Sequence, residues 1–285
     1  MSGTTVLARG DFDPALVAAV TRATEAAARA AGAWFGRGDK DAADGAAVAA
    51  MRAALVNAPF DGTVVIGEGE KDAAPMLANG ERLGAGNSPR CDVAVDPLDG
   101  TRLTAEGLPG SISVIALAPA DTMFDPLDVF YMDKIVAGPV GIGVLDLRRS
   151  ATQNLEAYAI AAGIPVGELV VVVLDKPRHE SLIAEIRAAR ATVRLVGEGD
   201  VLAAVAAASA GSDVDLVLGI GGTPEGIVAA CAVRALGGFM QGRLAPQSDE
   251  QLAMAIAAGH DTNRILELDD LVASDRVLFV STAVT

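Results

Sequence analysis

The chain has 285 residues, of which 51% are hydrophobic and 21% are charged, and its formal net charge is −15 at pH 7. This length allows a large buried core and favours two closely associated α/β domains over a single one. The acidic excess argues against nucleic acid or an anionic membrane as a partner, because no basic surface is available to neutralise phosphate groups.

From the sequence we expect no segment for membrane insertion or export. Its start lacks an apolar stretch, and no later apolar run reaches about 18 residues without a charge, Gly or Pro. We therefore expect a soluble, cytoplasmic protein. Cys91 and Cys231 are isolated in sequence, which indicates reduced thiols rather than a disulfide or a zinc site. With only His179 and His260 present, catalysis is expected to rest on carboxylates.

An Ala-rich helix is predicted to begin at Asp13-Pro14 and to end near Gly32. Its apolar positions fall on one face: Leu16, Ala19, Val20, Ala23, Ala27 and Ala30.

A Gly-rich loop at 34–40 then leads to a second helix, with Val48, Met51 and Leu55 facing inward. Asp44 precedes these residues and is a plausible N-cap, so that capping alone is the alternative to a functional role.

Two buried strands are predicted to end in acidic residues. Residues 63–66 run into GEGEKD at 67–72, where the flanking glycines leave the Glu68 carboxylate at the strand end. Residues 93–95 form a second strand, which we expect to break in a turn at Asp96-Pro97 and to place Asp99 three residues later. Two such close carboxylates favour a hard divalent cation between them. The alternative is a pair of surface turns with solvated acids.

The middle of the chain contains two further predicted strands, at 111–117 and 140–147. Between them lies a polar and aromatic stretch at 121–134, which includes Tyr131 and Lys134. Because the composition shifts around Arg148, we divide the chain into domains at 1–148 and 149–285.

The second half alternates strands with helices, which predicts a parallel or mixed sheet with ligands at the carboxyl ends of its strands. The strands are expected at 169–174, 192–196, 214–220 and 276–281, and the helices at 180–190, from Asp200 and from Thr223. Candidate ligand groups follow the first three strands: Lys176 and Arg178, then Glu198 and Asp200, then the glycines of 219–222.

The string GIGGTPEG at 219–226 has the composition of an anion-binding turn at a helix N-terminus. Thr223 is expected as N-cap and Pro224 as the first helical residue, and the glycine amides are free to face an anion. Glu225 either stabilises the helix dipole or completes a cation site. The string matches neither a P-loop nor GxGxxG, which argues against ATPase and dinucleotide-binding functions.

Taken together, the acids at glycine-bounded turns and the two cations favour hydrolysis of a phosphate ester. Bound metal ions would lower the pKa of a water molecule and so supply a nucleophile without histidine. Lys176 and Arg178 would hold a second anion and orient the substrate. The acids are Asp44, Glu68, Asp96, Asp99 and Glu225.

Several ordered motifs between residues 34 and 244 carry a family resemblance. DPLDGT at 96–101 resembles the signature of the lithium-sensitive, metal-dependent phosphatase superfamily. Four further motifs resemble the class II fructose-1,6-bisphosphatases, including bifunctional fructose/sedoheptulose bisphosphatases: GRGDKDAADGAAVAAMR at 36–52, VVIGEGEKDAAPML at 64–77, DKPRH at 175–179 and GIGGTPEG. The resemblance implies an α/β fold, a layered αβαβα sugar-phosphatase sandwich of two associated mixed-sheet domains.

The resemblance also implies a set of site residues. The metal ligands, for Mg²⁺ or Mn²⁺, would be Asp44, Glu68, Asp96, Asp99 and Glu225. Asp99, Gly100 and Thr101 would contact the reacting phosphate, and Thr101 paired with an acid would help to activate the water. The sugar and its second phosphate would be lined by Tyr131, Lys176, Pro177, Arg178, Glu198, Gly199, Asp200 and Gly222. Lys40 is expected to aid phosphate binding or loop ordering.

We therefore predict a phosphatase that hydrolyses the 1-phosphate of a sugar bisphosphate. The expected substrate is fructose-1,6-bisphosphate, with sedoheptulose-1,7-bisphosphate as a second one, and the expected assembly is a homo-oligomer, a dimer or a tetramer. The alternatives are a phosphatase of inositol, cyclitol or other sugar phosphates within the same superfamily, and a non-catalytic sugar-phosphate sensor.

Overall fold

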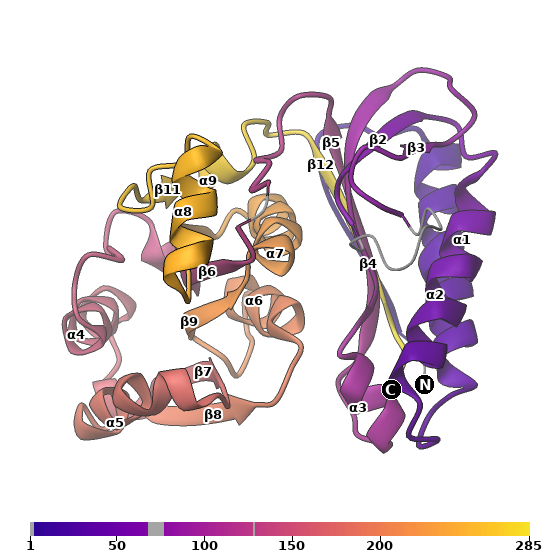
Figure 1. Cartoon of the computed structure of the whole chain (residues 1–285). Helices are drawn as coiled ribbons and strands as arrows, with labels where there is room; N and C mark the ends of the chain where they lie inside the picture. Colours follow the sequence, from indigo (N-terminus) through magenta and orange to yellow (C-terminus); the bar gives the residue numbers. More distant parts are fainter. Residues whose placement is uncertain (1–2, 68–76, 128) are drawn as a thin grey trace. The chain divides into compact units, whose positions relative to one another are not determined.

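The computed structural model describes residues 3–67, 77–127 and 129–285 (Figure 1). The chain forms two compact units, the first from residues 1–125 together with 272–285 and the second from residues 126–271. In the described residues each unit contains a six-stranded mixed sheet packed with helices, which confirms the predicted α/β class. No described helix is both long and apolar enough to span a membrane.

The units do not follow the predicted division at 148/149. Strand β6 (Tyr131–Ala137) pairs with strands of the second unit, and the last strand, β12 (Val277–Ala283), pairs with strands of the first. The chain therefore returns to its first unit at its end. A shift in local composition cannot predict such a return, because it reflects only neighbouring residues.

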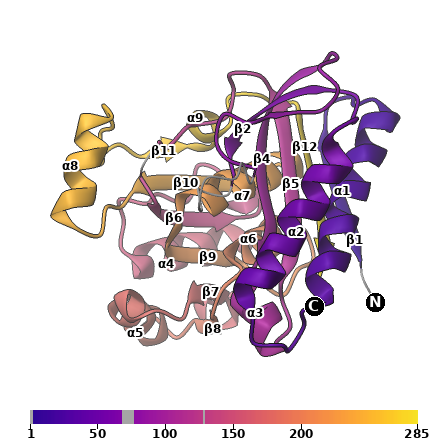
Figure 2. The ribbon, with the colours of Figure 1, turned by 45° about the vertical axis from the view of Figure 1, so that its right-hand side comes forward.

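The sheet of the first unit has the order β1-β12-β5-β4-β2-β3. Helices α1 (Pro14–Gly32) and α2 (Lys40–Leu55) lie side by side on one face of it (Figures 1 and 2). Their apolar faces share a core with the strands, through residues such as Leu16, Met51 and Val93. The remaining elements are β1 (Thr4–Arg9), β2 (Asp61–Ile66), β3 (Arg82–Leu83), β4 (Arg90–Asp99), β5 (Ile112–Pro119) and the short helix α3 (Thr101–Glu106).

The two N-terminal helices begin at aspartate caps. Asp13 caps α1 as predicted, accepting a hydrogen bond from the Ala15 amide at 2.7 Å, although Ala30 is only half-buried. The cap of α2 is Asp39, which accepts from the Ala42 amide at 2.9 Å, and the predicted cap Asp44 is wrong. Asp44 lies inside the helix because α2 starts at Lys40, five residues earlier than a cap at Asp44 would require, and its side chain is buried.

Strand β4 continues through Asp96-Pro97, where we had predicted a turn. Asp96 pairs with Val114 of β5 and Asp99 with Ile112, so three steps along β4 oppose two along β5, which is a β-bulge. A bulge is one of the few places where a strand tolerates proline. The turn comes after Asp99, at Gly100, whose φ of 86° favours glycine.

The sheet of the second unit has the order β11-β10-β6-β9-β7-β8. Helices α4 and α5 contribute to a core on one face of it, while α6 and α7 pack against each other and against β6 and β9. Its strands are β7 (Val170–Leu174), β8 (Thr192–Val196), β9 (Leu216–Gly222), β10 (Phe239–Leu244), β11 (Leu266–Glu267) and β6. Its helices are α4 (Ala151–Ala162), α5 (Glu180–Ala188), α6 (Asp200–Ala208), α7 (Thr223–Leu236), α8 (Asp249–Ala257) and α9 (Leu268–Leu271), with 3-10 helices at Pro139–Gly141, Val166–Glu168 and Pro177–His179.

Two predictions in this unit are wrong. Residues 140–147 form a 3-10 helix and turns instead of a strand, because Pro139, Gly141 and Gly143 favour tight turns and Gly143 has a φ of 72°. The N-cap of α7 is Gly222, so Thr223 is already the first helical residue and Pro224 follows it.

Candidate functional site

The bulge in β4 puts Asp96 and Asp99 on the same face of the sheet. Val95 and Leu98 both lie in the core with α1 and α2, and each acid directly follows one of them. Since successive side chains of a strand alternate between faces, both acids face away from that core. Asp96 Oδ1 accepts a hydrogen bond from the Leu98 amide at 3.0 Å, which fixes the backbone between the two acids.

The turn after Asp99 is closely packed. A Cβ on Gly100 would lie 3.3 Å from the Ser111 Cβ. The Ser111 hydroxyl lies 2.7 Å from that of Thr104 and 2.9 Å from that of Thr285, which ties α3 to the start of β5. Thr101 begins α3 directly after this turn and stays partly exposed.

Helix α2 brings Asp44 into the same unit as these acids. The amides of Gly36 and Gly38 donate to the carbonyls of Thr104 and Ala105 in α3, both at 2.9 Å, and α2 packs against α3 and β4. The loop before α2 is therefore anchored to the helix that follows Asp99. Lys40 is exposed, and its Nζ lies 3.6 Å from Asp41 Oδ1. Glu68 and most of its GEGEKD motif lie outside the described residues.

In the second unit the predicted substrate-binding residues meet at one edge of the sheet. Strands β7, β8 and β9 are parallel, so their carboxyl ends lie together. Strand β6 is antiparallel to β9 and pairs Tyr131 with Gly222, which brings the start of β6 to that edge. This edge therefore gathers Tyr131, Lys176, Pro177, Arg178, Glu198, Gly199, Asp200, Gly222 and Glu225.

Arg178 is held in place at this edge although it is exposed. Its guanidinium donates to the Ile220 carbonyl from Nε at 3.1 Å and from Nη2 at 2.8 Å. Its centre also lies 5.2 Å from the ring centre of Tyr131, a cation–π contact. These contacts fix the orientation of the Arg178 side chain.

His179 joins the ends of β7 and β9. Its Nδ1 lies 2.8 Å from the Leu174 carbonyl, and its Nε2 accepts from the Ile220 amide at 2.8 Å. These partners require a neutral ring with the proton on Nδ1. Burial lowers the pKa of His179, and the nearby Arg178 adds to that effect.

Glu225 and Asp200 approach a lysine that sequence reasoning had not assigned to the site. The Lys134 ammonium lies 2.5 Å from Asp200 Oδ2 and 3.0 Å from the Gly222 carbonyl. Burial raises the pKa of Glu225, the charge of Asp200 adds to this, and Lys134 opposes it. The available signal was a lone lysine within the apolar strand YMDKIVA.

The residues present fit a hard divalent cation. The predicted ligands offer only carboxylate oxygens, which Mg²⁺ and Mn²⁺ prefer. Glu225 Oε2 is buried and makes no hydrogen bond to the described residues, as expected of an atom reserved for a ligand. In the described part of the chain, no three or more His, Cys, Asp or Glu side chains are grouped closely enough to hold a metal.

Both cysteine side chains are buried, Cys91 in the first unit and Cys231 in helix α7 of the second. Burial raises the pKa of the Cys91 thiol to about 11. A thiol is nucleophilic only as thiolate, so Cys91 is unreactive near neutral pH.

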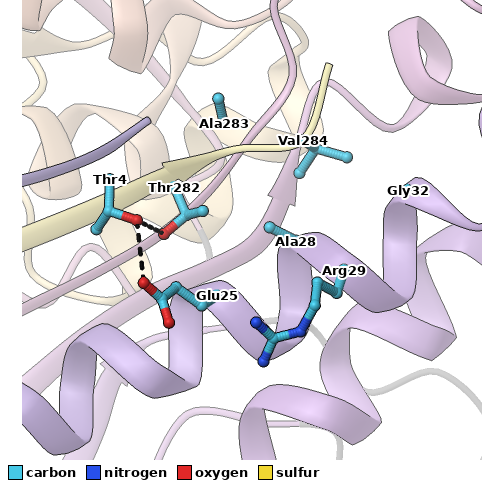
Figure 3. Close-up of a pocket in the computed structure, with 8 residues that line it drawn as sticks. All are labelled: Thr4, Glu25, Ala28, Arg29, Gly32, Thr282, Ala283 and Val284. Atoms are coloured by element: carbon cyan, nitrogen blue, oxygen red, sulfur yellow. Dashed lines mark hydrogen bonds between the residues drawn. The ribbon is translucent and has the colours of Figure 1, made fainter. Parts of the chain in front are cut away.

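A separate pocket in the first unit holds none of the predicted site residues. It has a volume of about 340 Å³ and contains a chain of polar groups (Figure 3). Thr4 lies 3.1 Å from the Thr282 hydroxyl and donates to Glu25 at 3.5 Å.

Comparison with known proteins identifies similar sequences over nearly the whole chain. The family described as "Bacterial fructose-1,6-bisphosphatase, glpX-encoded" matches residues 14–285. The chain is 42% identical over 278 residues to "Fructose-1,6-bisphosphatase 1 class 2" of Escherichia coli (strain K12), which covers 93% of this chain and 82% of that relative. The identity and the coverage are the same for "Fructose-1,6-bisphosphatase class 2" of Escherichia coli O6:H1 and of Shigella flexneri.

Proposed function

Because this chain belongs to the family of bacterial, glpX-encoded fructose-1,6-bisphosphatases, we propose that it hydrolyses the 1-phosphate of fructose-1,6-bisphosphate. It is accordingly a phosphoric monoester hydrolase of carbohydrate metabolism. The observation that carries this proposal is the family match over residues 14–285, which includes every predicted site residue. Sedoheptulose-1,7-bisphosphate is proposed as a second substrate.

The family's metal dependence agrees with the carboxylates of this chain, and we propose Mg²⁺ or Mn²⁺ as the ion. The proposed ligands are Asp44, Glu68, Asp96, Asp99 and Glu225. Such an ion, when bound, lowers the pKa of a water molecule and polarises the phosphoryl group. Two of these acids, Asp96 and Asp99, share a face of β4 in support of this role.

The chain's own groups would bind and orient the sugar bisphosphate. Asp99, Gly100 and Thr101 are proposed to contact the reacting phosphate, where the Thr101 hydroxyl, paired with an acid, helps to take a proton from the water. Lys176 and Arg178 are proposed to hold the second phosphate. The fixed orientation of Arg178 supports this, because a preordered guanidinium loses little entropy when it binds an anion.

Phosphate release from fructose-1,6-bisphosphate, measured with Mg²⁺ or Mn²⁺ and with EDTA, tests this function. We expect release that stops with EDTA and returns with metal, and release that ignores chelation contradicts the metal mechanism. Asp96→Asn should abolish release without unfolding the protein. Asp92→Asn is the matched control, because Asp92 lies on the same strand as Asp96 but accepts hydrogen bonds from the amides of residues 121–123. This variant should lower stability and keep turnover.

The second phosphate separates a bisphosphatase from a monophosphatase. Replacing Lys176 and Arg178 together by Ala should raise KM for fructose-1,6-bisphosphate far more than for a monoester such as an inositol monophosphate. Equal effects on both substrates would favour the monophosphatase. The homo-oligomer, a dimer or tetramer, stays a prediction that light scattering after gel filtration would test.

A further inference from the structure

Lys134 occupies an unusual position for a lysine. It lies within β6, paired with Gly219 of β9 and with Gly242 of β10, and only 4% of it is exposed. The next residue, Ile135, belongs to the core shared with α4 and α5, so Lys134 faces the opposite side, toward α6 and α7. Lysine is almost never so fully buried unless its charge is paired.

The ammonium joins two elements of the proposed site. It donates to Asp200 Oδ2 at 2.5 Å, at the start of α6, and to the Gly222 carbonyl at 3.0 Å, at the end of β9. The Asp200 side chain is itself only 9% exposed. A charge-assisted hydrogen bond in a buried place fixes its partners more firmly than a surface ion pair does.

The glycines beside this lysine leave room for the acids. A Cβ on Gly221 would lie 2.1 Å from Asp200 Oδ2 and 2.8 Å from the lysine nitrogen. A Cβ on Gly222 would lie 1.7 Å from Glu225 Oε2. The Glu225 carboxylate therefore packs directly against the backbone of Gly222, whose carbonyl Lys134 holds.

We propose that Lys134 is a positioning residue, which fixes the Gly222 end of β9 and thereby the Glu225 carboxylate in the geometry that a divalent cation requires. This inference rests on the proposed function, in which Glu225 is a metal ligand. Lys134 touches neither substrate nor reacting atoms in this role. It acts through Gly222 and Asp200.

A simpler role has to be separated from this one, namely that Lys134 only neutralises the buried charge of Asp200. In that case, removing both charges together should leave nothing for the lysine to do. If Lys134 also positions Gly222 and Glu225, its loss still matters when Asp200 is uncharged. The comparison of Asp200→Asn with Lys134→Met/Asp200→Asn distinguishes the two roles.

The experiment measures Mn²⁺ binding by electron paramagnetic resonance, the melting temperature in EDTA, and kcat and KM for fructose-1,6-bisphosphate. Lys134→Met should lower the melting temperature and weaken Mn²⁺ binding and kcat/KM by about 10- to 100-fold, as loss of groups that orient metal ligands does. Lys134→Met/Asp200→Asn should recover the melting temperature but stay at least about 10-fold below Asp200→Asn in Mn²⁺ affinity.

Arg234→Met is the matched control, because Arg234 is another largely buried cation. It lies near the C-terminal end of helix α7 and forms an ion pair with Asp269 of α9. This variant should lower the melting temperature and keep the Mn²⁺ affinity. Equal Mn²⁺ affinity of Asp200→Asn and the double variant overturns the inference, even if Lys134→Met alone fails to fold. A wild-type protein that binds Mn²⁺ without releasing phosphate refutes the proposed function alone, and one that binds no Mn²⁺ overturns both.

Discussion

Asp96 and Asp99 lie on one face of β4 although three positions separate them along the strand. In a regular strand, residues an odd number of positions apart point to opposite faces. The bulge opposite Val114 and Ile112 reverses that parity, so that Leu98 and Val95 both lie in the core shared with α1 and α2. The apolar anchor of Leu98 and the orientation of Asp99 are therefore linked.

We therefore expect that shortening the buried Leu98 side chain lowers the phosphatase activity. Leu98→Ala removes a side chain that is 1% exposed and should cost about 3 kcal/mol of unfolding free energy. It should also lower kcat/KM, because the bulge loses the contact that fixes its register. Val93→Ala, on the same strand before the bulge, should lower stability and leave kcat/KM unchanged. Urea unfolding and phosphate-release assays on both variants check this, and a parallel loss of activity in Val93→Ala would contradict it.

The His179 ring predicts a pH dependence of stability. Its pKa is lowered in the folded protein below the ordinary value of 6.5, so the unfolded chain binds the proton more readily. The stabilisation is therefore fully present above pH 6.5 and is lost as the pH falls through that value toward the folded pKa. Protonation would also turn the Nε2 acceptor into a donor facing the Ile220 amide.

His179→Ala isolates this effect. At about pH 8 it should cost about 1–3 kcal/mol, because the Ile220 amide and the Leu174 carbonyl lose their buried partner. The difference from wild type should shrink at about pH 5.5, because the stabilisation by the neutral ring is progressively lost as the pH falls below 6.5. Urea unfolding at both values measures it, and a difference that grows as the pH falls would refute the neutral ring.

Substitutions of Asp39, the cap of α2, and of Asp44, inside that helix, should affect stability and activity separately. Asp39→Ala removes the cap of the Ala42 amide and should cost about 1 kcal/mol without reducing turnover. Asp44→Asn leaves this cap intact and should reduce turnover, in line with its proposed role as a metal ligand. Thermal unfolding and phosphate release measured side by side decide between these roles. Full turnover in Asp44→Asn would remove Asp44 from the ligand set.

Sequence patterns predicted those features that depend on near neighbours. The spacing of apolar residues located α1 and the strand at 63–66, because burial of one face imposes a local period. The edge that gathers Lys176, Arg178 and Gly222 was also foreseeable, since parallel strands present their carboxyl ends together.

Other features depend on residues that are distant in the sequence, and they could not be predicted from the neighbouring residues alone. The bulge at Asp96 exists through the pairing of β4 with β5, and proline with aspartate alone reads as a turn. Asp39 and Asp44 are equally good caps in isolation, and only the packing of α2 selects the earlier one. The burial of Lys134 is explained by its ion pair with Asp200, which lies 66 positions further along the chain.

The contact between Tyr131 and Arg178 gives a final prediction about substrate affinity. With its ring centre 5.2 Å from the guanidinium, Tyr131 holds Arg178 partly by a cation–π attraction. Tyr131→Leu removes the ring and should raise KM for fructose-1,6-bisphosphate by about 3- to 10-fold, for a contact worth about 0.5–1 kcal/mol plus lost orientation. Tyr131→Phe keeps the ring and should stay closer to wild type.

The matched control for this change is Phe12→Leu, which removes the ring that lies 4.9 Å from the guanidinium of Arg276, outside the proposed site. It should leave KM unchanged. Steady-state kinetics on the three variants provide the measurement. If Tyr131→Phe raises KM as much as Tyr131→Leu, the hydroxyl and not the ring is the important group, and Tyr131 would then act on the sugar phosphate directly instead of through Arg178.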